Sequence, residues 1–128
     1  MSLIDLYPSL NDYCRLQAEP NKDKKLDGYS LKAFLQEPDT DTCDGQDVTI
    51  SVVSSNIPVP LNMSTDKGLQ HYSVRSKMYR YILCSNNEEE LYDHETDLYE
   101  WHNAAYNYEY RHIKEYMNRR LVEIIGCR

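Results

Sequence analysis

An apolar stripe near the end of the chain constrains the fold more than any other feature of the sequence. Its members recur at intervals of four and three residues, the repeat of one face of an α-helix. Asn103 or Asn107 can cap the start of such a helix, and Gly126 can end it. We therefore predict a terminal helix within residues 103–126 that buries its apolar face. The stripe consists of Tyr106, Tyr110, Ile113, Met117, Leu121 and Ile124.

The middle of the chain predicts the surface against which this helix packs. Residues 48–53 are rich in β-branched side chains, and residues 71–75 and 78–83 alternate between two faces. A further short strand is expected over residues 89–92, after a turn rich in Asn. These segments predict an antiparallel sheet of three to four strands within residues 48–93. Helices packed on such a sheet form an α+β fold.

The first part of the chain, residues 1–38, is expected to be a helical entry segment. Leucines at three- and four-residue spacing indicate a helix from about residue 5 to residue 16, with Asp5 as its cap. A shorter helix is expected over residues 31–36, capped by Ser30.

Composition limits the partners of the chain. The 128 residues suit one modest domain, and 14 Lys and Arg against 21 Asp and Glu give a net charge of −7. This acidity argues against a nucleic-acid partner, whose phosphates require basic side chains. No apolar run approaches the ~18 residues of a membrane span. The four cysteines are widely spaced and are taken as structural thiols, although two disulfides are an open alternative.

No catalytic motif or metal-ligand pattern is visible, so we assign no catalytic residue and no metal ligand. His94 and His102 lie among acidic residues, but a polar loop is favoured there over a metal site. One strand face carries His71, Ser73 and Arg75. We select His71 and Arg75 as candidates for binding an anionic group through charge-assisted hydrogen bonds. The alternative is that Arg75 forms an internal ion pair and His71 lies at the rim.

Three segments resemble the sulfatase family of the alkaline phosphatase superfamily. Residues 71–103, HYSVRSKMYRYILCSNNEEELYDHETDLYEWHN, are similar to its V-R-[ST]-x-x-[YW]-[RK]-Y-I strand, its E-E-L-Y-D strand and its D-P-x-E-x-x-N-L-A turn. Residues 4–10, IDLYPSL, resemble its V-D-L-Y-P-T-L helix, and residues 26–31, LDGYSL, its L-D-G-x-S-L turn. The style is that of iduronate-2-sulfatase-like bacterial glycan sulfatases. Leu98 departs from the pattern, since the family has Pro there.

The resemblance implies that residues 1–128 form a C-terminal subdomain of a longer sulfuric ester hydrolase. Sulfatases use a formylglycine, made from the Cys or Ser of a C/S-x-P/A-x-R motif, beside a calcium ion. Neither Cys14, Cys43 nor Cys84 begins such a motif. No cofactor is therefore expected in this chain, and formylglycine and calcium are expected in an upstream catalytic domain. The chain by itself is expected to be inactive.

The partners implied are the protein's own catalytic domain and a sulfated glycan or other sulfate ester, with His71 and Arg75 lining the cleft. By family analogy the parent enzyme is expected to be periplasmic or secreted. The alternative is a stand-alone, non-catalytic interaction or glycan-binding module; a small stand-alone hydrolase is disfavoured because no nucleophile–base pair is visible. The residues interpreted as structural, fixing the turn into the last helix, are Tyr92, Asp97, Glu100, Trp101 and Asn103.

Overall fold

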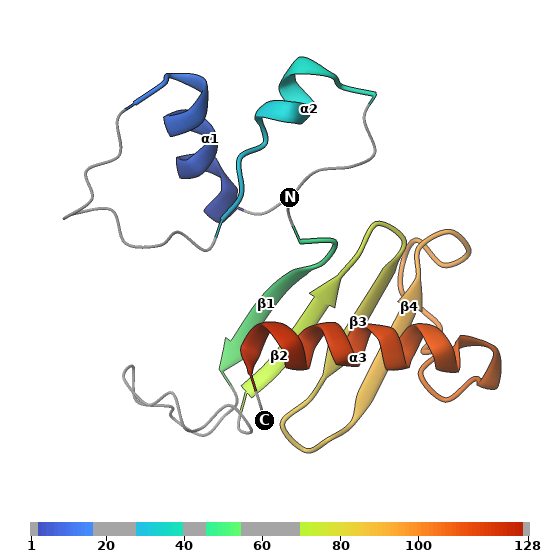
Figure 1. Ribbon diagram of the computed structural model, residues 1–128. Coiled ribbons are helices and arrows are strands. Elements are labelled where there is room, and N and C mark those ends of the chain that lie inside the picture. The colour runs from blue at the N-terminus through green and yellow to red at the C-terminus, as the bar shows by residue number, and fades with distance from the viewer. Residues whose placement is uncertain (1–2, 17–27, 40–45, 55–69, 127–128) are drawn as a thin grey trace. The chain divides into compact units, whose positions relative to one another are not determined.

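A computed structural model describes residues 3–16, 28–39, 46–54 and 70–126 (Figure 1). The chain divides into two compact units, Met1–Asp47 and Val48–Arg128, and each is described by itself. Helices and an antiparallel sheet confirm the α+β class. That both units belong to one subdomain stays a prediction.

The second unit contains a four-stranded sheet, as predicted. Its strands lie in the order of the sequence, and each neighbouring pair is antiparallel. They agree with the expected segments to within one or two residues, because period-two patterns show where a half-buried strand begins and ends. The strands are β1 (Thr49–Ser54), β2 (Gln70–Arg75), β3 (Tyr79–Leu83) and β4 (Glu89–Asp93).

The terminal helix, α3 (Arg111–Ile125), begins later than the predicted start at residue 103. Asn103 does not cap it, because its amide is used at the edge of the sheet. Its Oδ1 accepts from the backbone N–H of Leu91 at 3.0 Å, and its Nδ2 donates to the carbonyl of Glu89 at 3.1 Å. The backbone N–H of Ala104 also donates to the Leu91 carbonyl at 2.8 Å. These bonds cover the edge of β4, which would otherwise present unpaired backbone groups.

The other end signals of the helix act as predicted. Asn107 precedes a 3₁₀ turn, η3 (Tyr108–Tyr110), and its Oδ1 accepts from the N–H of Glu109 at 3.1 Å. Gly126 follows α3 with a φ of 75°, a backbone conformation that L side chains rarely adopt. The helix therefore ends at a glycine, the residue type that most often follows the last turn of an α-helix.

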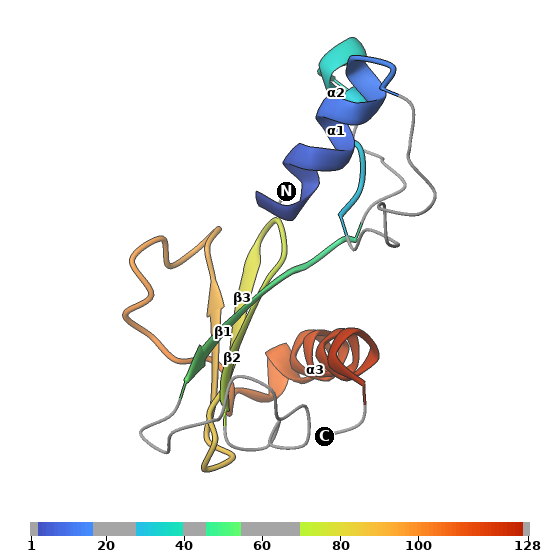
Figure 2. The same ribbon diagram turned by 90° about the vertical axis from the view of Figure 1, so that its left-hand side faces the viewer.

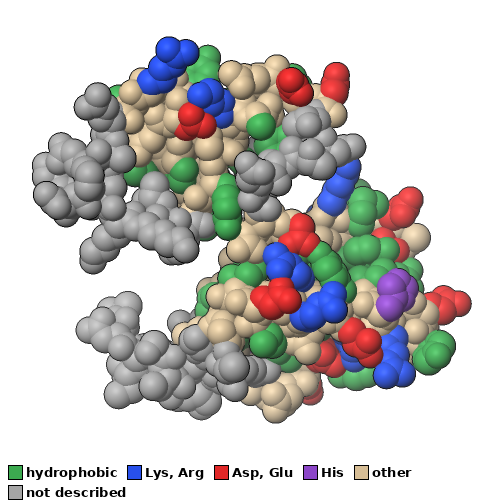
Figure 3. All heavy atoms as spheres, in the orientation of Figure 1, with side chains coloured by type: hydrophobic (Ala, Val, Ile, Leu, Met, Phe, Trp, Pro, Cys, Tyr) green, Lys and Arg blue, Asp and Glu red, His purple; other side chains and the backbone are tan. Residues whose placement is uncertain are grey.

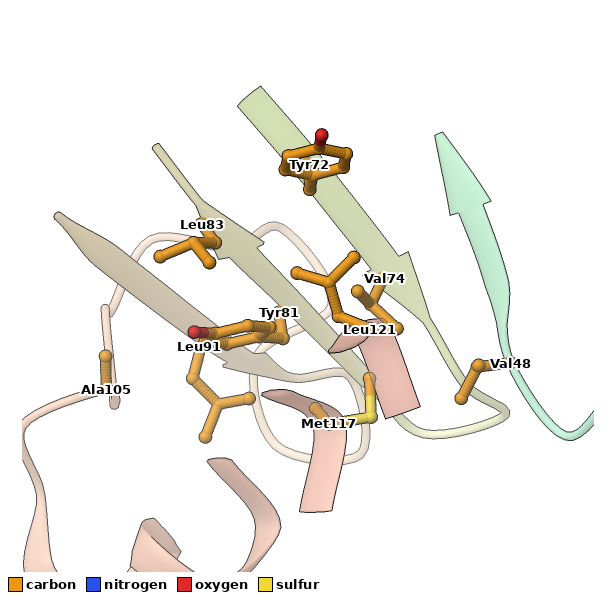
Figure 4. Packing of buried hydrophobic residues seen from close by; sticks show 9 residues of the cluster. All are labelled: Val48, Tyr72, Val74, Tyr81, Leu83, Leu91, Ala105, Met117 and Leu121. Carbon is orange, nitrogen blue, oxygen red and sulfur yellow. The ribbon is translucent and has the colours of Figure 1, made fainter. Parts of the chain in front are cut away.

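Helix α3 covers one face of the sheet, here called the inner face (Figure 2). Met117 and Leu121 on the helix are fully buried, and so are the residues opposite them in the middle strands (Figure 4). Tyr72 and Val74 point inward as their alternation predicted. The buried core consists of Val48, Tyr72, Val74, Tyr81, Leu83, Leu91, Ala105, Met117 and Leu121.

Polar contacts tie the helix to the sheet at the margin of this core. Glu89 accepts from the hydroxyl of Tyr81 at 2.6 Å and from Nζ of Lys114 at 2.8 Å. Burial alone raises the pKa of Glu89, but the bonds from Lys114 and Tyr81 outweigh it and hold the pKa below its usual value. The ion pair therefore stabilises the fold at pH values above the usual pKa of a Glu side chain. This stabilisation is lost as the pH falls through the lowered pKa of Glu89. Toward solvent, basic and acidic side chains are interspersed over α3 (Figure 3).

The first unit contains a 3₁₀ turn η1 (Leu3–Asp5), α1 (Leu6–Tyr13) and α2 (Lys32–Gln36). The predicted helix over residues 5–16 thus ends three residues early. Asp5 is the N-cap residue by position, as predicted, but its side chain makes no capping hydrogen bond; its Oδ1 accepts from the backbone N–H of Tyr29 at 3.0 Å. A contact between distant segments has replaced the local cap.

That contact joins two of the segments that resemble the sulfatase family, around residues 4–10 and 28–31. Gly28 lies so close to η1 that an added Cβ would stand 2.1 Å from the carbonyl oxygen of Ile4. The N–H of Leu31 donates to Oγ of Ser9 at 2.8 Å. Ser30 accepts from the N–H of Lys32 at 3.2 Å, but the N-cap of α2 is Leu31, so the helix begins one residue later than predicted and Ser30 precedes the cap. Glycine is required here by close approach.

Replacing Leu121 with Ala should destabilise the second unit by about 2–5 kcal/mol, because it removes buried methyl groups and leaves a cavity. Urea unfolding followed by far-UV circular dichroism measures the change. Val122→Ala, on the same helix at a side chain that is 40% exposed, is the matched control and should cost much less. Equal losses in the two variants would contradict the assignment of Leu121 to the core.

Candidate functional site

The face of the sheet away from α3, here called the outer face, is where the candidate residues lie (Figure 2). Residues directly opposite each other in neighbouring strands project from the same face. The register therefore places one row of side chains across all four strands of this face. The row consists of Thr49, Arg75, Arg80 and Tyr92.

His71 and Arg75 share the outer face, as predicted, but they are not brought together. They stand four residues apart on β2 and turn to different neighbours. His71 is half-buried, and its Nδ1 accepts from the backbone N–H of Ser85 at 3.3 Å. The exposed Arg75 guanidinium contacts the ring of His94, with Nη1 2.8 Å from Nε2. Within the described ranges no carboxylate forms an ion pair with Arg75. The alternative interpretation, in which Arg75 is one half of an internal ion pair, requires such a carboxylate.

Arg75 stands directly opposite a second arginine, Arg80, on β3. Like charges opposite each other destabilise a sheet unless they are compensated. Arg80 is compensated on two sides: Nε donates to Oγ of Ser73 at 3.1 Å, and Nη1 lies 2.6 Å from Oε2 of Glu100. The other oxygen of Glu100 lies 2.6 Å from Nε2 of His94. Two arginines, a histidine and a carboxylate thus form one network.

Sequence reasoning did not find this network. Alternation along β3 placed Arg80 on the outer face, but nothing local to the sequence pairs it with a residue 20 positions later. His94 and Glu100 lie in the polar stretch where a metal site was disfavoured, and in the structure Nε2 of His94 forms a hydrogen bond with Oε1 of Glu100 at 2.6 Å. The sequence contained one indication of the network, its charge pattern. Two arginines on one face of a sheet repel each other and favour an acidic partner nearby.

Glu100 occupies a left-handed backbone conformation, with a φ of 59°. For a residue other than glycine this conformation costs about 1–2 kcal/mol. The ion pair with Arg80 and the hydrogen bond with His94 hold the side chain in place and so oppose that cost. The strained residue lies between Tyr99 and Trp101, whose rings stack on each other.

The turn into the last helix is fixed largely as predicted. Oδ2 of Asp97 accepts from the backbone N–H of His102 at 2.7 Å, and this bond is the main cause that holds the pKa of Asp97 below its usual value. The contacts of Asp97, Glu100 and Asn103 confirm their structural interpretation. Trp101 is different. Its side chain is 77% exposed, so burial of the indole does not fix the turn.

Tyr92, at the β4 end of the row, donates its hydroxyl proton to Glu90 at 2.9 Å. Burial and this bond to a carboxylate raise the pKa of Tyr92 to about 12. Both causes favour the neutral phenol on a partly covered face. This contact lies within β4, so the part predicted for Tyr92 in fixing the turn into the last helix stays a prediction.

Within the described ranges, no group of three or more His, Cys, Asp and Glu side chains could hold a metal ion. No helix in those ranges combines the length and apolar character needed to cross a membrane. Cys14 and Cys84 are free thiols, and Cys43 and Cys127 lie outside the described residues.

Comparison with known proteins gives a structural match and no sequence match. No family model and no curated protein matches the chain. Among solved structures, a phosphonate monoester hydrolase of Agrobacterium radiobacter is similar at a TM-score of 0.66 and 20% identity. A protein solved with its substrate D-glucosamine-2-N,6-O-disulfate is similar at 0.71 and 20%, and a 2-O GAG sulfatase at 0.66 and 24%.

Each match covers 94% of this chain but 23% or 24% of the solved structure. The chain therefore spans about a quarter of the length of the proteins it resembles. The resemblance to sulfatases, drawn from three sequence segments, is confirmed for the fold, and the comparison adds phosphonate monoester hydrolases to the proteins with a similar fold.

The raised pKa of Tyr92 is testable by alkaline titration. The tyrosinate absorbance of the unaltered chain, minus that of the Tyr92→Phe variant, gives the titration of Tyr92 alone. This difference should have its midpoint at about pH 12. Since the folded-state pKa is raised, the contribution of Tyr92 to stability is present below its ordinary pKa of 10.0 and lost as the pH rises toward 12. Circular dichroism on the same samples reports the folded fraction.

Glu90→Gln is the control for this titration. It removes the negative acceptor but leaves the ring where it is, so the pKa of Tyr92 should fall without returning to 10.0, because burial is the larger cause. A difference spectrum with its midpoint at pH 10 in the unaltered chain would contradict the assigned environment.

Proposed function

We propose that this chain is the C-terminal subdomain of a sulfatase that hydrolyses sulfate esters of glycans. In that enzyme the subdomain packs on the catalytic domain and lends its outer face to the substrate cleft. The reacting groups, formylglycine and calcium, belong to the upstream catalytic domain. The parent enzyme is periplasmic or secreted.

The observation that carries this proposal is the pattern of coverage. Nearly all of this chain, 94%, matches a quarter of each larger hydrolase, while three segments resemble sulfatase motifs in the family's order. Two of those segments, around residues 4–10 and 28–31, contact each other in the first unit. The chain shares its fold with these hydrolases but lacks the sulfatase nucleophile motif. Both facts are explained if the chain is one part of such an enzyme.

Helix α1 and the turn before it support a partner that covers the first unit. Their apolar side chains recur at helical spacing and are more than half exposed. Such a patch is unusual on a protein surface that has no binding partner. The catalytic domain of the same protein is the occupant we propose for this stripe. The stripe consists of Leu3, Leu6, Tyr7, Leu10 and Tyr13.

The outer face supports a role in binding sulfate. Arg75 is exposed, carries a fixed positive charge and has the His94 ring as its contact, so its remaining N–H groups can serve an anion. His71 adds a second polar side chain on the same strand face. A sulfate ester offers several acceptor oxygens that suit the planar guanidinium. The part of this chain in the reaction would be to bind and orient the ester.

The parent activity is tested by expressing the full-length protein from its genomic reading frame. We expect it to release sulfate from an aryl sulfate, and the 128-residue chain alone to release none. Release by the chain alone, with contaminants excluded, would contradict the proposal. A full-length protein without any sulfatase activity on aryl or glycan sulfates would favour a non-catalytic interaction or glycan-binding module.

Arg75→Ala in the full-length enzyme should raise the KM for a sulfated glycan about 10- to 100-fold, because a charge-assisted hydrogen bond contributes about 1.5–3 kcal/mol. His71→Ala should raise it less. Arg111→Ala removes another exposed arginine, from the first turn of α3, and is the control, with KM and kcat expected to be unchanged. Wild-type KM and kcat in both outer-face variants would exclude the cleft role.

A further inference from the structure

Tyr99 and Trp101 form a stacked aromatic pair on the surface of the second unit. Their ring centroids lie 5.5 Å apart and their planes differ by 26°. The residues are 72% and 77% exposed. Each ring thus covers part of one face of the other and leaves its opposite face open to solvent. Large aromatic side chains exposed together are a mark of a binding surface.

The loop that carries the pair is built to hold it. Glu100, between the two aromatic residues, has the left-handed backbone and is anchored by Arg80 and His94. The N–H of Glu100 also donates to the carbonyl of Asp97 at 3.2 Å. Strained residues that the surrounding structure holds in place are concentrated at functional sites. A pair fixed in advance loses little conformational freedom when a ligand binds.

We propose that Tyr99 and Trp101 form a platform that binds a pyranose ring of a glycan by stacking. The C–H face of a pyranose is apolar and about the size of one aromatic ring, and its hydroxyl groups stay in water at the edge. Two partly exposed rings offer on the order of 300 Å². A standard protein–protein interface needs about 800 Å² on each partner, so the pair fits a sugar ring better than a protein.

Charge near the platform selects the kind of sugar ring. Glu95 and Asp97 lie in the same loop, the charge of Glu100 is compensated by Arg80, and the chain as a whole is acidic. These carboxylates disfavour a sulfated ring, whereas stacking does not require charge. The platform is therefore suited to an unsulfated ring, at a site separate from Arg75. The choice of a glycan rests on the proposed function; the platform itself rests on the geometry of the loop.

Trp101 is the only tryptophan of the chain, so its fluorescence reports on the platform directly. We would titrate the 128-residue chain with heparin hexasaccharides that have been desulfated and N-acetylated, and separately with the sulfated hexasaccharides. A saturable change in Trp101 emission is expected with the desulfated sugar, at an affinity equal to or tighter than that of the sulfated one. No change with either sugar would overturn the proposal.

Tyr99→Ala keeps the reporter and removes its stacking partner, so the affinity for the desulfated hexasaccharide should fall about three- to tenfold. Trp101→Ala, followed by calorimetry, should lose at least as much. Tyr108→Ala removes a tyrosine that is 81% exposed elsewhere and is the matched control. An equal loss in Tyr108→Ala would contradict a specific platform.

The alternative occupant of the platform is a second copy of this chain, and dilution of the chain without sugar tests for it. A Trp101 emission that depends on protein concentration, together with dimers in sedimentation, would overturn the sugar proposal. The platform can fail while the full-length protein is still a sulfatase, because the aryl sulfate assay does not involve a sugar ring. Sugar binding without sulfatase activity would instead leave the platform intact and remove the proposed parent enzyme.

Discussion

Burial of Met117 and Leu121 against the inner face of the sheet is the interaction on which the rest of the second unit depends. An antiparallel sheet has two faces, and one helix can cover one of them. Because α3 takes the inner face, the tyrosines and leucines that point inward form the core, and the alternate positions are left for polar side chains. Every candidate residue on the outer face is placed there by this division.

The outer face in turn depends on how its positive charge is compensated. Arg75 and Arg80 stand side by side across β2 and β3, an arrangement that requires a carboxylate nearby. Glu100 supplies it from a loop beyond β4 and contacts Arg80 and His94 together. Arg80 is thereby neutralised, whereas the exposed Arg75 is left facing a histidine ring. The network therefore concentrates the available positive charge at one position of the face.

The features predicted from sequence are those that repeat along the chain. Alternation located the strands and assigned Tyr72 and Arg75 to opposite faces, and the stripe in α3 located the helix, because burial acts on every second or every third to fourth residue. Side chains that contact distant segments carry no such repeat. Asp5 was expected to cap α1 and binds Tyr29 instead, and Asn103 holds the edge of β4. Both residue types can serve a local cap or a distant backbone group, and tertiary structure decides between them.

Glu100 connects the two proposed binding surfaces. Its side chain belongs to the network that determines which arginine is available on the outer face, and its left-handed backbone joins Tyr99 to Trp101 in the chain. A cation binds through charge and is screened by salt, whereas stacking rings bind an apolar face and are screened little. A glycan that carries sulfate on some rings and none on others presents both chemistries. Under these two proposals, one strained residue would support both a charged contact and an uncharged contact, because Glu100 anchors the network beside Arg75 and also lies between Tyr99 and Trp101 in the sequence.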